Sequence, residues 1–165
     1  MLTDAQELLW RMYAENAAHA RHHEVLRSNV SGYVLIVATA LVGIVTFDRS
    51  LGGWVDIMTE CFIICVGLFG SAFVMKHYER YRLHMARAQE YRAAIDRLLP
   101  APILQQCKDR GDAAHATRWH FIRRLRVAYW WASLNLFVAL VGVALLAVTL
   151  GAPLEAPSPG PAEAR

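Results

Sequence analysis

Three stretches of the chain carry no charged side chain, and they dominate its pattern: residues 28–47, 61–75 and 127–154. A bilayer core of about 30 Å is crossed by about 20 apolar residues in a helix. The first and third stretches reach that length alone. The second reaches it when its helix begins near Trp54, with Asp56 and Glu60 at its outer end. The pattern predicts an all-α integral membrane protein with spanning helices at about 29–47, 54–75 and 127–150.

The polar segments complete this organisation. Residues 1–28 are predicted to form an N-terminal amphipathic helix, with Thr3 and Gln6 at the spacing of a capping box. No Gly or Pro lies between Ser71 and Leu99, so a long basic helix is expected to continue from the second span without a break. Residues 76–126 are expected to be a basic helical segment in which Asp112 caps the last helix. The proline-rich residues 151–165 are expected to be a disordered tail.

Charge assigns an orientation to these segments. Of the 17 Lys and Arg residues, 12 lie between Lys76 and Arg126, and only Arg49 lies between the first two spans. Because Lys and Arg in short loops stay on the cytoplasmic side, the N-terminus and residues 76–126 are predicted to be cytoplasmic. Residues 48–55 and the C-terminus are then outside. The predicted location is a bacterial inner (plasma) membrane, crossed several times.

Small and polar residues within the spans are the candidates for a pore or gate. Glu60 lies about 9 Å along its helix from Trp54, where it could line the mouth of a pore in an oligomer or snorkel to the outer surface. Glycine and serine allow close approach of membrane helices, and Asn135 is the only strongly polar residue of the third span. The pore or gate candidates are Glu60, Gly67, Gly70, Ser71 and Asn135.

The basic segment combines Arg, His and Tyr side chains. Attraction to anionic lipid, about 1 kcal/mol per basic residue, explains these charges. The alternative is a site for a negatively charged nucleotide, with phosphate contacts from Arg and stacking from Tyr, or for a cytoplasmic signalling protein. No duplex nucleic acid is expected as a partner. The candidates for lipid, ligand or partner binding are Arg80, Arg82, His84, Arg87, Tyr91, Arg92, Arg123 and Arg124.

Little in the sequence indicates catalysis or a cofactor. His19 and His23 are one turn apart beside His22, but two ligands without an obvious third predict a solvated or partner-facing cluster rather than a metal site. No G-x-S-x-G, P-loop or dinucleotide glycine motif is present. The loose Arg110–His115 pair matches a ribonuclease spacing that is expected by chance in so basic a chain. We therefore expect no catalytic residue, no metal and no cofactor.

Two stretches carry a resemblance to a known family. The segments YAENAAHARHHEVLR and YERYR–HMARAQEYRAAID flank a two-helix membrane hairpin, and this layout, over about residues 10–99, resembles the SLATT domain. The resemblance implies a small bacterial membrane effector of an antiviral conflict system, homo-oligomeric and pore-forming. The alternative hypothesis is a non-channel membrane anchor or scaffold that recruits a cytoplasmic partner.

Overall fold

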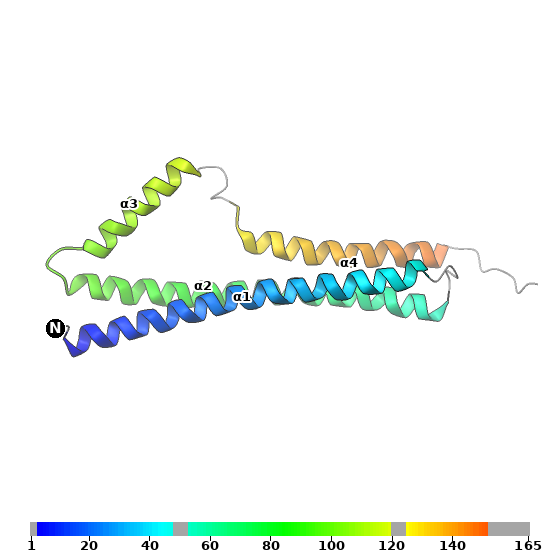
Figure 1. Ribbon diagram of the computed structural model, residues 1–165, viewed down its shortest axis with the longest axis horizontal. Coiled ribbons are helices and arrows are strands. Elements are labelled where there is room, and N and C mark those ends of the chain that lie inside the picture. Colours follow the sequence, from blue (N-terminus) through cyan, green and yellow to red (C-terminus); the bar gives the residue numbers. More distant parts are fainter. Residues whose placement is uncertain (1–2, 48–52, 120–124, 152–165) are drawn as a thin grey trace, which may run out of the picture.

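The fold is built from helices alone across the part of the chain that the structure describes. The computed structural model describes residues 3–47, 53–119 and 125–151 (Figure 1). Its helices are α1 (Asp4–Phe47), α2 (Trp54–Arg97), α3 (Ile103–Arg118) and α4 (Val127–Gly151). The all-α prediction is confirmed, and α1, α2 and α4 are each long and apolar enough to cross a membrane.

The helices α1 and α2 lie side by side and run in opposite directions (Figure 1). Each has 44 residues, which corresponds to a length of about 66 Å, roughly twice the thickness of a bilayer core. The hairpin therefore has two halves of different character. We call residues 28–47, 54–75 and 127–151 the apolar half, and residues 4–27 and 76–118 the polar half.

The predicted N-terminal segment and the first span are one helix, with no boundary at residue 28. The sequence there offers only Ser28 and Asn29, which cost little in a helix interior, and no proline. The predicted cap at the start of α1 is confirmed. The Thr3 amide donates to Gln6 Oε1 at 2.9 Å, and the Gln6 amide donates to Thr3 Oγ1 at 3.3 Å.

The unbroken helix predicted from the second span through the basic segment is present as α2, which ends at Arg97 shortly before Pro100. The helix α2 is the centre of the fold, because it packs on α1 along the hairpin and on α4 in the apolar half. A core cluster joins the three helices: Val34 and Ala38 of α1, Ile63 of α2, and Val138 of α4.

The helix α3 differs from the prediction. Residues after Pro102 form a 16-residue helix, and Gly111 lies within it. The expectation that Asp112 caps the last helix is wrong, since Asp112 lies inside α3 and accepts a bond from Lys108 Nζ at 2.6 Å. The N-terminus of α3 is instead held by Asp96, whose carboxylate oxygens accept the amides of Leu104 and Gln105, both at 2.9 Å.

The third span is confirmed as α4, which lies beside α2 in the apolar half (Figure 1). The expected disordered tail beyond Gly151 and the candidates Arg123 and Arg124 lie outside the described residues.

Candidate functional site

A buried carboxylate lies within the apolar half. The side chain of Glu60 is fully buried between α2 and α4, and Thr149 Oγ1 donates to Glu60 Oε1 at 2.6 Å. Glu60 Oε2 has no hydrogen-bond partner among the described residues. The structure therefore excludes the snorkelling expected as one alternative for Glu60, because the carboxylate faces the helix bundle.

A second buried polar contact lies nearer the middle of α4. Asn135 Nδ2 donates to Ser31 Oγ of α1 at 2.9 Å and to the Trp131 carbonyl of its own helix at 2.8 Å. This is the hydrogen bond to a neighbouring helix that the sequence predicts for Asn135. Its Oδ1 is buried and has no partner within the described part of the chain. A serine–asparagine bond of this kind ties α1 to α4 in a setting without water.

Glycines bring α2 and α4 into backbone contact between these two polar sites. A Cβ on Gly67 would lie 2.5 Å from the Ala139 amide nitrogen, and one on Gly70 would lie 2.6 Å from Asn135 Oδ1. From the other side, a Cβ on Gly142 would lie 2.8 Å from Ile64 Cγ1. Only glycine fits at such distances, which explains the small residues by close helix packing.

The five pore or gate candidates thus meet along one helix contact. Ser71 Oγ donates to the Ala132 carbonyl at 3.3 Å, so all five, Glu60, Gly67, Gly70, Ser71 and Asn135, lie where α2 meets α4. Thr149 and Ser31, which bond the two polar members, were not among the predicted site residues. Each is separated from its partner by about 90 residues or more in sequence, and small hydroxyl residues carry no local signal of such pairing.

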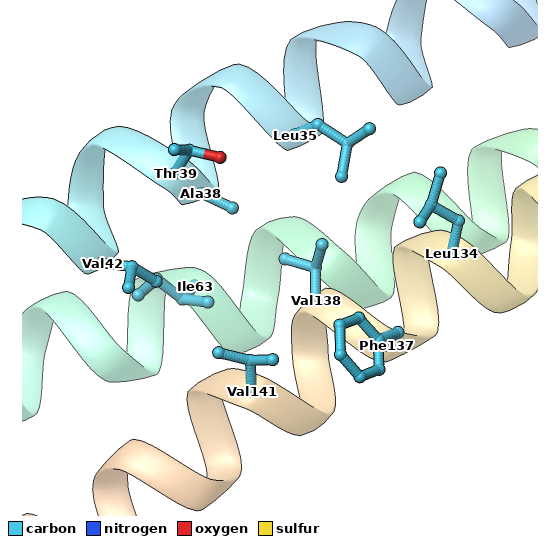
Figure 2. A pocket seen from close by; sticks show the side chains of 9 residues that line it. All are labelled: Leu35, Ala38, Thr39, Val42, Ile63, Leu134, Phe137, Val138 and Val141. Atoms are coloured by element: carbon cyan, nitrogen blue, oxygen red, sulfur yellow. The ribbon is translucent and has the colours of Figure 1, made fainter.

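A groove in the apolar half separates α1 from α4. It has a volume of about 260 Å³ and Ile63 of α2 lies at its side (Figure 2). Apart from Thr39, every lining residue is apolar: Leu35, Ala38, Val42, Ile63, Leu134, Phe137, Val138 and Val141. The groove follows from the weaker packing of α1 on α4 than of either helix on α2.

The basic candidates on α2 do not share one face. Arg80, Arg82 and Arg87 are exposed, whereas Tyr91 and Arg92 are half-buried near the corner with α3. Arg92 Nη2 donates to Gln105 Oε1 at 3.3 Å, and Arg82 Nη1 lies 3.5 Å from the Tyr78 hydroxyl. Arg80 also lies 3.9 Å from a Glu79 carboxylate oxygen, and all three exposed arginines are accessible from the surface, whereas Arg92 helps to hold α3.

His84 is placed differently from the arginines, because it faces α1. Its Nδ1 lies 3.1 Å from Asn16 Oδ1, and its ring stacks on His19 and His23 with centroid distances of 5.1 and 5.4 Å. His77, one step nearer the apolar half, places its Nδ1 3.0 Å from His23 Nδ1. We call His19, His22, His23, His77 and His84 the histidine cluster.

The histidine cluster is an electropositive, partly desolvated contact. Partial burial, followed by the neighbouring positive groups, lowers the pKa of His23, His77 and His84 below the ordinary 6.5. The positive groups acting on His84 are His19, His23, Arg87 and Arg80. No group of three or more metal ligands with suitable geometry occurs among the described residues.

The sequence predicts the α1 side of this cluster, and on α2 it predicts His84 only as a lipid, ligand or partner contact and does not predict His77. His77 and His84 are seven residues apart, which places them two turns apart on one helix face. His19 and His23 are one turn apart on α1. The register between the two antiparallel helices was the missing information, since it determines which residues of the polar halves meet.

Comparison with known proteins identifies no relative of this chain. No protein-family model, no curated protein and no solved structure matches the chain. The length and apolar composition of α1, α2 and α4 define an α-helical membrane protein. Two of these helices, α1 and α2, continue without a break far beyond the apolar half, and this distinguishes the protein from a bundle of simple spans.

Proposed function

We propose that the protein is a homo-oligomeric effector of a bacterial inner membrane, which permeabilises that membrane when a ligand engages the basic polar half of α2. The observation that carries this proposal is the continuity of α2 from Trp54 to Arg97. A force on the exposed Arg80 and Arg87 reaches the Glu60–Thr149 contact through one uninterrupted helix. The antiviral role implied by the resemblance of the sequence to the SLATT domain fits an effector of this kind.

The orientation in this proposal is that predicted from charge, with the polar half in the cytoplasm and the chain end after α4 outside. The ligand is then a cytoplasmic signalling protein or a nucleotide second messenger. Arg80, Arg82 and Arg87 are exposed, as charge-assisted contact with phosphate or carboxylate requires.

The proposed gate is the contact between α2 and α4. Rotation of α2 would separate Glu60 from Thr149 and Gly67 from Ala139, and would turn a carboxylate out of the interior of the chain. Three helices of one chain enclose no aqueous path, so permeation requires several copies whose Glu60 side chains surround a common axis.

Membrane potential measures the proposed activity directly. Cells induced to express the protein are stained with a potential-sensitive dye, and depolarisation is expected in the wild type. Glu60→Gln keeps the size of the side chain, removes its charge, and is expected to weaken cation flux. Thr59→Val on the same helix is the matched control, since among the described residues the Thr59 hydroxyl bonds only the Val55 carbonyl of its own helix, at 2.8 Å. Unchanged potential and normal growth under every activating condition would exclude a pore.

A membrane scaffold is the second candidate, and one observation favours it. Both strongly polar pore candidates, Glu60 and Asn135, are engaged inside the chain by Thr149 and Ser31. A scaffold needs these residues only for packing. It predicts that Glu60→Gln is silent, whereas Arg80→Glu with Arg87→Glu abolishes recovery of the cytoplasmic partner. A monomer in detergent favours the scaffold, and a closed ring favours the pore.

A further inference from the structure

The histidine cluster is the place where α1 and α2 meet through titratable groups. His19, His22 and His23 come from α1, and His77 and His84 come from α2. His23 lies at the centre, with ring centroids 5.1 Å from His77, 5.4 Å from His84 and 6.0 Å from His22. The cluster begins directly beside the apolar half, where the Phe73 ring stacks on His77 at 4.0 Å.

We infer that the histidine cluster is an acid-sensitive clamp, which holds the polar halves of α1 and α2 together while its imidazoles are neutral and releases them when they are protonated. The contact between His23 Nδ1 and His77 Nδ1, at 3.0 Å, is a hydrogen bond only when one nitrogen carries a proton and the other accepts it. Two imidazolium rings present two N–H donors and two positive charges at this distance. That contact then becomes repulsive.

Among the described residues, no carboxylate pairs with His23, His77 or His84, so protons added to these three rings are not neutralised. Arg80 acts on both His23 and His84, and Arg87 acts on His84. Glu15 Oε1 lies 3.6 Å from His19 Nε2, whereas Glu24 contacts Arg27, and Glu79 contacts Lys76 and lies 3.9 Å from Arg80 Nε. The third helix of the bundle contributes no counter-charge, since residues 127–151 contain no charged side chain.

The lowered pKa values give the direction of the pH dependence. The folded contact binds protons less readily than free histidine, so separated helices take up more protons than packed helices. The stabilisation is therefore complete above the ordinary histidine value of 6.5 and is lost progressively as the pH falls below it.

This inference stands apart from the proposed permeation, because it concerns only the contact between α1 and α2. Its test uses the full chain in phosphatidylcholine nanodiscs, whose zwitterionic headgroups add no anionic surface. Amide hydrogen exchange, corrected for intrinsic rates, is followed between about pH 7.5 and about pH 5. Protection of residues 12–27 and 76–90 is expected to fall about tenfold or more at the lower pH, while α4 keeps its protection.

Two variants separate the clamp from general acid effects. His23→Gln with His77→Gln replaces the imidazole pair by amides that can hydrogen-bond without titrating, so the pH response is expected to be lost. His115→Gln on α3 is the matched control and keeps the response. Constant protection in the wild type, or an undiminished response in the double variant, would overturn the clamp.

A second measurement, made on the wild type, tests the clamp even if the double variant does not fold. Nitrogen NMR of ¹⁵N-histidine-labelled wild type gives the titration midpoints of the cluster and of His115 separately. Midpoints of His23 and His77 below that of His115 support the clamp. Midpoints equal to or above that of His115 contradict it.

Discussion

At the scale of single residues, the hydrogen bond from Thr149 to Glu60 is the most consequential side-chain contact of the apolar half. Glu60 is fully buried and one of its oxygens already lacks a partner among the described residues. Such a carboxylate depends on the bond that remains, because a buried acceptor without a donor costs about 1–3 kcal/mol. Hydrogen bonds between membrane helices contribute about 0.6 kcal/mol on average, so we expect the loss of the Thr149–Glu60 bond to cost at least about that much.

Thr149→Val removes the donor without changing the shape of the side chain. We expect the bundle to lose about 1–2 kcal/mol of stability, measured by denaturant unfolding in detergent micelles. Thr46→Val is the matched control, because within the described part of the chain the Thr46 hydroxyl bonds only the Val42 and Gly43 carbonyls of its own helix. Equal losses in the two variants would show that the contact with Glu60 adds nothing.

Gly67 makes a prediction of a different physical kind. A Cβ there would lie 2.5 Å from the Ala139 nitrogen and 2.8 Å from the Asn135 carbonyl oxygen, so backbone atoms must move. Gly67→Ala is expected to force α2 and α4 apart and to cost about 1–3 kcal/mol in the same unfolding measurement.

Gly43→Ala on α1 provides the comparison for Gly67, since nothing lies within 4 Å of a Cβ at that position. It should leave stability unchanged or raise it slightly, because alanine favours the helix. If Gly67→Ala left the free energy of unfolding unchanged, α2 and α4 would not be in the contact described.

At the scale of the elements, the corner between α2 and α3 rests on Asp96. Its carboxylate accepts the first free amides of α3, from Leu104 and Gln105. Asp96→Ala is expected to cost about 1–2 kcal/mol at this corner, in the range of a lost helix cap. Amide exchange of residues 103–107 should accelerate, while exchange in the apolar half stays unchanged.

Asp109→Ala tests whether the effect belongs to the cap. Asp109 also accepts a bond within α3, from Gln105 Nε2 at 2.8 Å, but through an exposed side-chain pair. Exposed pairs contribute little, so exchange at residues 103–107 should hardly change. Similar acceleration of amide exchange at residues 103–107 in both variants would show that Asp96 does not cap α3.

The elements also show what the sequence could predict. The three spans follow from the charge-free stretches, and the continuity of α2 follows from the lack of Gly and Pro between Ser71 and Leu99. A helical segment was predicted for residues 76–126, but the cap was misplaced at Asp112, because the residue that holds the N-terminus of α3, Asp96, lies before two prolines and outside that helix. The pairs Glu60–Thr149 and His23–His77 depend on which helix faces which, and periodicity along one helix does not contain that information.

At the scale of the whole molecule, the antiparallel hairpin links two chemically different environments. Each of its helices crosses from the apolar half to the polar half without interruption. The exposed arginines, the histidine cluster and the Glu60–Thr149 contact all lie along α2. The helix α2 therefore connects the polar half to the contact with α4.

The orientation of the molecule is the final prediction, and a native cysteine can test it. Cys107 is exposed on α3, in the part predicted to be cytoplasmic, whereas Cys61 and Cys65 lie within the apolar half of α2. With Cys61→Ser and Cys65→Ser in place, a membrane-impermeant maleimide should label Cys107 in inverted vesicles but not in intact spheroplasts. Adding Ser158→Cys with Cys107→Ser should reverse this pattern, because residues 151–165 are predicted to be outside. Labelling of Cys107 in intact spheroplasts would show that the orientation is the opposite of the predicted one. Arg80 and Arg87 would then lie outside, where no cytoplasmic signal can reach them.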